Sequence, residues 1–123
     1  MPEFNIVLAI SDTIIRKVLT RRFKDTDYTI LEAKDGNEAI SRIESENVHL
    51  VVAEEMLPYH NGFELIGISK SRNIPVIIIS DADLEEKLLE AFELGADDFI
   101  DKPFSPNELF VRVKNQLKRQ ETT

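Results

Sequence analysis

The sequence contains no cysteine and only two histidines, His49 and His60. Without thiols the chain has no disulfide framework, no thiolate metal site and no cysteine nucleophile. Two histidines leave little scope for a zinc site. These classes of site are therefore set aside.

The sequence also has no long apolar run and no basic amino-terminal segment. No uninterrupted apolar run approaches the roughly 18 to 20 residues of a membrane helix. An acidic residue, Glu3, stands where a secretory signal would be basic. We therefore expect a soluble, cytoplasmic protein that does not contact membranes.

Positive charge is in deficit, because 15 lysines and arginines face 23 aspartates and glutamates, for a formal net charge of -8. A negative field of this kind repels phosphate backbones. The one basic cluster, Arg16, Lys17, Arg21 and Arg22, has no interleaved aromatic residue to stack bases, and we interpret it as a solvated helix face. Direct binding of nucleic acid by this chain is not expected.

Short apolar runs alternate with helical patterns along the whole chain. Residues 6–10, 50–53 and 76–79 are β-branched runs typical of strands buried on both faces. Residues 28–33 and 99–100 are more mixed or shorter, which is typical of edge strands. The apolar residues that recur at helical spacing between these runs are Ile15, Val18 and Leu19; Ala39, Ile40 and Ile43; Phe63 and Ile66; Leu84, Leu88 and Ala91; and Leu109, Val113 and Leu117.

Helix boundaries agree with this alternation. Asp35-Gly36-Asn37 opens the second predicted helix, Gly95 closes the fourth, and Ser105-Pro106 supplies a cap and a proline at the start of the fifth. The pattern predicts one α/β domain over residues 1–123, with a doubly wound, five-stranded parallel sheet. In such a sheet the functional site lies at the carboxyl ends of the strands.

Four motifs occur in order along these units. They are Pro58 followed by Gly62-Phe63, Pro75 before a strand ending in Ser80, Gly95-Ala96-Asp97-Asp98-Phe99, and Lys102-Pro103-Phe104. Together they resemble the response-regulator receiver family of two-component signalling over nearly the whole chain. The resemblance implies a (βα)5 flavodoxin-like fold with strand order 2-1-3-4-5 and a cis bond between Lys102 and Pro103.

The resemblance also implies a site, and this sequence departs from it. Ordinary receivers carry two acidic residues after the first strand, where this chain has Ile10 and Ser11, followed by Asp12. The aspartate nucleophile, four residues before the proline, is replaced by Glu54. The remaining positions match: Ser80 is the switch hydroxyl, Phe99 the switch aromatic, and Lys102 and Pro103 belong to the pocket.

These departures remove what phosphoryl transfer to a carboxylate requires. Mg²⁺ prefers oxygen ligands in tight octahedral geometry, whereas Ile10 offers no ligand and Ser11 only a neutral hydroxyl. The extra methylene of Glu54 moves its carboxylate outward by about 1 Å, a shift that can cost roughly a hundredfold in rate. We expect no metal, no cofactor, no catalytic residue and no enzymatic activity.

Several alternatives remain open at this point. Asp12, Glu54 and Glu55 could form a weak metal site and support Mg²⁺-dependent phosphorylation at a non-standard carboxylate. Glu54 could instead be a surface residue without a role, and Ser80 and Phe99 ordinary strand residues. A flavin or nucleotide binder is disfavoured because residues 10–15 contain no glycine to wrap a phosphate.

An ion pair between Glu54 and Lys102 is the central expectation for the site, since a desolvated charge without a partner costs several kcal/mol. Such a pair would imitate, with one negative charge instead of nearly two, the phosphorylated state. Ser80 is expected to hydrogen-bond the same carboxylate.

A second surface resembles the dimerisation face of the winged-helix transcription-factor branch of the family. Leu89, Phe92 and Phe110 would form its apolar part, or would simply be core or isolated surface residues. The surrounding ring of charges is Glu93, Asp98, Glu108, Arg112 and Lys114. Leu88 departs from the pattern, because that branch has a basic partner for Glu108 there, and the adjacent Lys87 is a substitute.

The function that we expect is therefore a phosphorylation-independent receiver that acts as a protein-interaction module. It would form a homodimer through the fourth helix, fifth strand and fifth helix, or dock to a protein partner or effector domain. Residues 118–123 are expected to begin a linker to such a domain.

Overall fold

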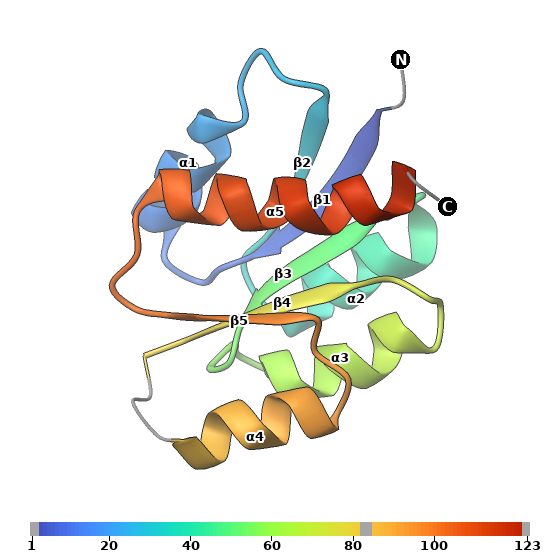
Figure 1. Ribbon diagram of the computed structural model, residues 1–123, viewed down its shortest axis with the longest axis vertical. Helices are drawn as coiled ribbons and strands as arrows, with labels where there is room; N and C mark the ends of the chain where they lie inside the picture. The colour runs from blue at the N-terminus through green and yellow to red at the C-terminus, as the bar shows by residue number, and fades with distance from the viewer. Residues whose placement is uncertain (1–2, 82–84, 122–123) are drawn as a thin grey trace.

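A computed structural model describes residues 3–81 and 85–121 and places a parallel sheet between two layers of helices (Figure 1). The strands are β1 (Phe4–Ala9), β2 (Tyr28–Ala33), β3 (Leu50–Glu54), β4 (Val76–Ser80) and β5 (Asp98–Asp101). The helices are α1 (Thr13–Arg22), α2 (Gly36–Ser45), α3 (Gly62–Lys70), α4 (Glu85–Glu93) and α5 (Pro106–Glu121). The order is β2-β1-β3-β4-β5 and every pair is parallel, which confirms the predicted fold class.

Successive side chains of the central strands point to opposite faces of the sheet, as the geometry of a strand requires. In β4, Val76 and Ile78 pack with α2, α3 and α4, whereas Ile77 and Ile79 pack with α1 and α5. The same alternation separates Val51 from Val52 in β3. Two apolar cores result, one on each face, and this explains why the central runs are apolar without interruption.

The predicted helix boundaries are confirmed where the sequence carried a capping signal. Asp35 caps α2 by accepting a hydrogen bond from the Glu38 backbone at 2.8 Å. Ser105 does the same for Glu108 in α5 at 3.1 Å. Gly95 follows α4 with a φ of 107°, a left-handed conformation that glycine adopts without strain.

The predicted buried face of α1 is wrong in part. Ile15 and Val18 are 43% and 52% exposed, while the buried stripe runs through Arg16, Leu19 and Phe23. The Arg16 guanidinium donates to the Ile10 carbonyl oxygen at 2.6 Å and pairs with a Glu32 carboxylate oxygen at 2.9 Å. The buried face of α1 therefore contains Arg16, whereas the apolar pattern predicted that Ile15 and Val18 are buried there.

The basic cluster on α1 is likewise only partly a solvated face. Lys17 and Arg21 are exposed as expected. Arg16 is buried, and the Arg22 guanidinium lies 3.9 Å from the centre of the Phe110 ring. The Lys17 ammonium also pairs with Glu32 at 3.0 Å, so three of the four cations make intramolecular contacts.

The carboxyl-terminal helix is longer than predicted. α5 continues through residue 121, so much of the expected linker segment is helical, and the Gln120 side chain donates to the His49 carbonyl oxygen at 2.9 Å. Residues 122 and 123, and Leu84 of the predicted α4 stripe, lie outside the described residues. Within the described part of the chain, no helix combines the length and apolarity needed to cross a membrane.

Candidate functional site

Two consecutive glutamates lie where β3 reaches the carboxyl edge of the sheet. Glu54 is the last residue of β3 and Glu55 follows it, and both are buried. The Gly62 backbone closes this turn by donating to the Glu55 carbonyl oxygen at 3.0 Å. A Cβ on Gly62 would lie only 2.4 Å from the Glu54 carbonyl oxygen, so the approach requires glycine.

Glu54 joins the ends of β1 and β5. One carboxylate oxygen accepts from the Ser11 backbone at 2.9 Å and from the Ser11 hydroxyl at 3.3 Å. The other oxygen lies 2.5 Å from the Lys102 Nζ, with the two side chains 10% and 32% exposed. The predicted ion pair is confirmed, and the alternative that Glu54 is a partly exposed surface residue is wrong, because Glu54 as a whole residue is 7% exposed.

Glu55 makes a second, separate set of contacts. One carboxylate oxygen accepts from the Ser80 hydroxyl at 2.6 Å, and the other lies 2.5 Å from the Lys87 Nζ. The prediction that Ser80 donates to Glu54 is wrong. Ser80 shares a sheet face with Val76 and Ile78, and the alternation of side chains places Glu55, not Glu54, on that face.

The contacts of Glu55 stabilise its charged form. Burial by itself raises the pKa of Glu55, but hydrogen bonds from Lys87 and Ser80 and the charge of Lys87 outweigh burial, so the pKa lies below its ordinary value of 4.5. The hydrogen bond and charge of Glu55 raise the pKa of Lys87 in turn. Both partners are therefore ionised at neutral pH.

Sequence reasoning considered Glu55 only as a weak metal ligand and Lys87 only as a substitute basic partner for Glu108. It missed the contact between these two residues. Within one chain the structure places the Lys87 ammonium against Glu55, and its pairing with Glu108 of a second copy stays a prediction. The contact between Glu55 and Ser80 could have been predicted from the alternation of side chains along β3 and β4, because it places both residues on the same face of the sheet.

The residues of the first loop do not fit a magnesium ion. Ile10 is 1% exposed and apolar, and the Ser11 hydroxyl is bonded to Glu54. Asp12 caps α1, because one of its carboxylate oxygens accepts from the Ile15 backbone at 2.9 Å. Glu54 and Glu55 each have a lysine against one oxygen. Over residues 3–81 and 85–121, no three acidic or histidine side chains gather as metal ligands.

Two further predictions for the pocket can be compared with the structure. The Lys102-Pro103 peptide bond is cis, as predicted. Phe99 is 9% exposed and packs in the core beneath α3 and α4. Its side chain therefore lies inward, on the same face of the sheet as Ser80.

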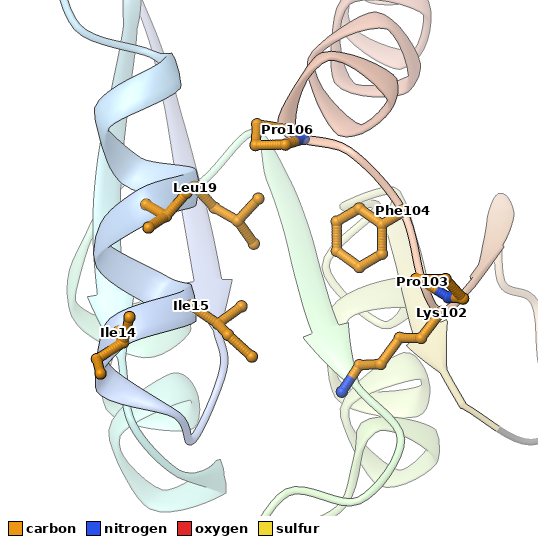
Figure 2. Close-up of a pocket in the computed structure, with 8 residues that line it drawn as sticks. Ile14, Ile15, Leu19, Lys102, Pro103, Phe104 and Pro106 are labelled. Carbon is orange, nitrogen blue, oxygen red and sulfur yellow. The ribbon is translucent and has the colours of Figure 1, made fainter.

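An apolar groove of about 360 Å³ adjoins the site on the side of α1. Figure 2 shows Ile14, Ile15 and Leu19 on one side of this groove, and Phe104, Pro106 and the Lys102 stem on the other. Lys102 thus contributes its methylene groups to the groove while its ammonium pairs with Glu54. The exposed apolar residues of α1, which are Ile14, Ile15 and Val18, line this groove.

The predicted dimer surface is only partly formed as expected. Leu89 and Phe92 of α4 are 54% and 46% exposed. Phe110 is wrongly assigned, because its ring packs 5.4 Å from Phe23 and 5.8 Å from Tyr28 within the chain. At 100° per residue, Phe110 lies on the opposite side of α5 from Arg112.

Charged residues of the predicted ring pair within one chain. Arg112 contacts an Asp98 carboxylate oxygen at 2.8 Å and a Glu108 oxygen at 3.3 Å. The side chains of Glu93 and Lys114 are exposed. Val111, which sequence reasoning missed, is 54% exposed and lines a shallow pocket with Asp98 and Arg112. The exposed apolar side chains on the helices of the predicted surface therefore include Leu89, Phe92 and Val111.

Comparison with known proteins agrees with the fold. The family model of the response regulator receiver domain matches residues 6–114 of this chain. The chain is 34% identical over 122 residues to the transcriptional regulatory protein ResD of Bacillus subtilis, covering 98% of this chain and 51% of ResD. It is 35% identical over 117 residues to a probable transcriptional regulator, ycf27, of Cyanophora paradoxa, covering 94% of this chain and 49% of that protein.

Solved structures give the same result. The receiver domain of the Francisella response regulator 1452 superposes with a TM-score of 0.88 at 34% identity, covering 96% of this chain and 99% of that chain. The chain thus matches nearly the whole of a solved receiver domain, whereas it spans about half the length of the curated relatives.

Proposed function

Since the chain belongs to the response regulator receiver domain family, we propose that it is an atypical receiver that signals by protein contact without accepting a phosphoryl group. Receiver domains are signalling modules that act on partner or effector domains. In this one, a built-in carboxylate replaces the phosphorylated residue. The proposed site of action is cytoplasmic, and neither nucleic acid nor membrane is a proposed ligand of this domain.

The observation that carries the proposal is the Glu54 to Lys102 ion pair of 2.5 Å. The family resemblance assigns Glu54 to the phosphoacceptor position and Lys102 to the lysine that contacts the phosphoryl group. Because the ammonium already lies against a carboxylate, that contact exists without phosphorylation. The absence of acidic side chains at Ile10 and Ser11 further supports the proposal, since nothing there replaces the usual Mg²⁺ ligands.

The test is incubation with acetyl phosphate and millimolar Mg²⁺, followed by intact mass measurement. We expect the mass of the protein to stay unchanged. A triple variant, Ile10→Asp, Ser11→Asp and Glu54→Asp, restores the ordinary carboxylates and serves as a positive control for the assay. A gain of one phosphoryl group in the unaltered protein that disappears in Glu54→Gln would overturn the proposal.

We further propose that the interaction is homodimerisation through α4, β5 and α5. Leu89 and Phe92 expose apolar surface on α4, and Val111 exposes apolar surface on α5 beside the ion pairs of Arg112. A two-fold axis would place each apolar patch against its copy. The intramolecular pair of Arg112 and Asp98 would then lie at the rim of the interface.

Sedimentation equilibrium tests this second proposal. The unaltered protein is expected to show a concentration-dependent dimer that Phe92→Ser weakens by tenfold or more, as expected for an apolar anchor worth above about 1.4 kcal/mol. Ile14→Ser is the control, because Ile14 is also an exposed apolar residue but lies on α1. A protein that stays monomeric at all concentrations contradicts this proposal without affecting the first.

A further inference from the structure

One buried carboxylate connects three elements of the fold at the carboxyl edge of the sheet. Glu55, at the end of β3, accepts from the Ser80 hydroxyl at the end of β4 and pairs with Lys87 on α4. The Glu55 side chain is only 6% exposed. The Lys87 ammonium also lies 5.6 Å from the centre of the Phe63 ring on α3. The carboxylate thus has one oxygen directed at the sheet and one at the helix.

The attachment of α4 to the rest of the molecule depends strongly on this contact. Among the residues of α4, Ala91 alone is fully buried, and Leu88 is partly buried against the core. Neighbouring α3 has four buried residues. Because α4 contributes so little apolar area, the ion pair between the buried Glu55 carboxylate and the partly exposed Lys87 is expected to be a large part of what holds it.

We propose that Glu55 is a positioning residue that holds α4 against the sheet through Ser80 and Lys87, and so sets the position of the exposed pair Leu89 and Phe92. The first part of this inference stands on the contacts of Glu55 alone. The second part, which gives the position of Leu89 and Phe92 a role, rests on the proposed dimerisation.

The chemistry of the two contacts requires a carboxylate of this length. A glutamine at position 55 can still accept from Ser80 through its amide oxygen, but its amide nitrogen cannot accept from Lys87. The depressed pKa of Glu55 agrees with a carboxylate that remains charged in both contacts. Glu55→Gln and Lys87→Met therefore remove the same ion pair, the first by changing the carboxylate and the second by changing the ammonium.

Amide hydrogen exchange at residues 85–93 tests the inference directly. In Lys87→Met and in Glu55→Gln we expect exchange in α4 to be about 10- to 100-fold faster, the range that corresponds to losing a charged hydrogen bond. Exchange in α2 should change by less than about threefold. Lys87→Arg keeps a cation of similar reach and is expected to restore most of the protection.

The matched control is Glu86→Gln, which removes a charge from the exposed side of the same turn of α4. It should leave exchange in α4 within about twofold of the unaltered protein, since substitutions of exposed residues rarely change stability. Unchanged exchange in Lys87→Met, or equal acceleration of α2 and α4, would overturn the inference. If Glu55→Gln does not fold, Lys87→Met still tests the inference. The Lys87 side chain is 37% exposed, so its replacement is expected to leave the protein folded.

Sedimentation equilibrium of the same variants separates this inference from the proposed function. If α4 loses protection and the dimer weakens, both parts are supported. If α4 loses protection and the dimer constant does not change, Glu55 positions α4 but its link to dimerisation is wrong. If no protein in the series dimerises, the dimerisation proposal fails, while the exchange data still decide whether Glu55 holds α4.

Discussion

Glu54 and Glu55 are neighbours with identical side chains, and yet they stabilise different parts of the molecule. Glu54 joins Ser11 after β1 to Lys102 after β5, so it acts within the edge of the sheet. Glu55 joins Ser80 to Lys87, so it acts between the sheet and a helix. The difference arises from strand geometry, because consecutive side chains leave a strand on opposite faces. The same functional group thus serves two regions, and substitutions at each of them can separate their contributions.

Among the substitutions that act on the two glutamates, the largest effect is expected from Gly62→Ala, because it disturbs both at once. The new Cβ would meet the Glu54 carbonyl oxygen at 2.4 Å, and relief requires the β3–α3 turn to move. We expect a loss of about 3 kcal/mol in the free energy of unfolding, at the upper end of the usual cost of overpacking. Urea unfolding measures this quantity.

Gly67→Ala is the matched control for that substitution. Gly67 is also a glycine of α3, but a Cβ there meets nothing within 4 Å. Alanine in the helix should therefore stabilise the protein by about 0.5 to 1 kcal/mol. Effects of the same sign at both glycines would show that the close approach of Gly62 to Glu54 is unimportant.

The next largest effect concerns the Glu54 side of the comparison. Glu54→Gln and Lys102→Met should each cost about 1 to 3 kcal/mol, because each leaves a poorly compensated charge at the sheet edge. The double variant should recover part of this loss through coupling. Lys118→Met, at an exposed position of α5, should have almost no effect. Strictly additive losses in the double variant would exclude a functional Glu54 to Lys102 interaction.

A smaller, pH-dependent effect distinguishes the Glu55 side. Its pKa is lower in the folded protein than in the unfolded chain, so folding favours the charged carboxylate. The resulting stabilisation is present above the unfolded value of about 4.5 and is lost as the pH falls through the folded-state pKa.

The measurement is the difference in unfolding free energy between the unaltered protein and Glu55→Gln. This difference should be largest near pH 7 and should shrink below pH 4.5. An increase in the difference on acidification would mean that burial outweighs Lys87 and Ser80 and that the pKa is raised.

The smallest effect is expected on α1, beyond both glutamates. Ile14 is 76% exposed, so Ile14→Gln should change the free energy of unfolding by less than about 0.5 kcal/mol. Leu19→Ala, on the buried side of the same helix, should cost about 2 to 5 kcal/mol. Similar costs at the two positions would mean that the groove lined by Ile14 is closed in solution.

The predictions that succeeded rest on local and periodic signals. The alternation of strands and helices, the capped starts of α2 and α5, and Gly95 after α4 follow from apolar spacing and from side chains that satisfy helix ends. The Glu54 to Lys102 pair also follows from sequence, since residues at the carboxyl ends of parallel strands meet at one edge. Each of these needs only short-range geometry and the direction of the strands.

The predictions that failed depend on which way a side chain points. Phe110 is an aromatic residue of the kind expected in a dimer interface, but its position around the axis of α5 directs its ring to Phe23 and Tyr28. Arg16 has the charge of a surface residue, but the Ile10 carbonyl oxygen and Glu32 satisfy its donors in the interior. Charge and hydropathy do not report such partners, because the partners are distant in sequence.

The amino-acid sequence by itself determined that this chain forms a five-stranded α/β domain with acidic and basic groups gathered at one edge. The apolar runs, their spacing and the turn residues suffice for this, because each acts over a few residues. Only the tertiary structure decided that Lys87 pairs with Glu55 and that Ser80 bonds Glu55 rather than Glu54. Those contacts depend on how α4 packs against the sheet and on which face each strand end presents, and both are set by the burial of the two cores together.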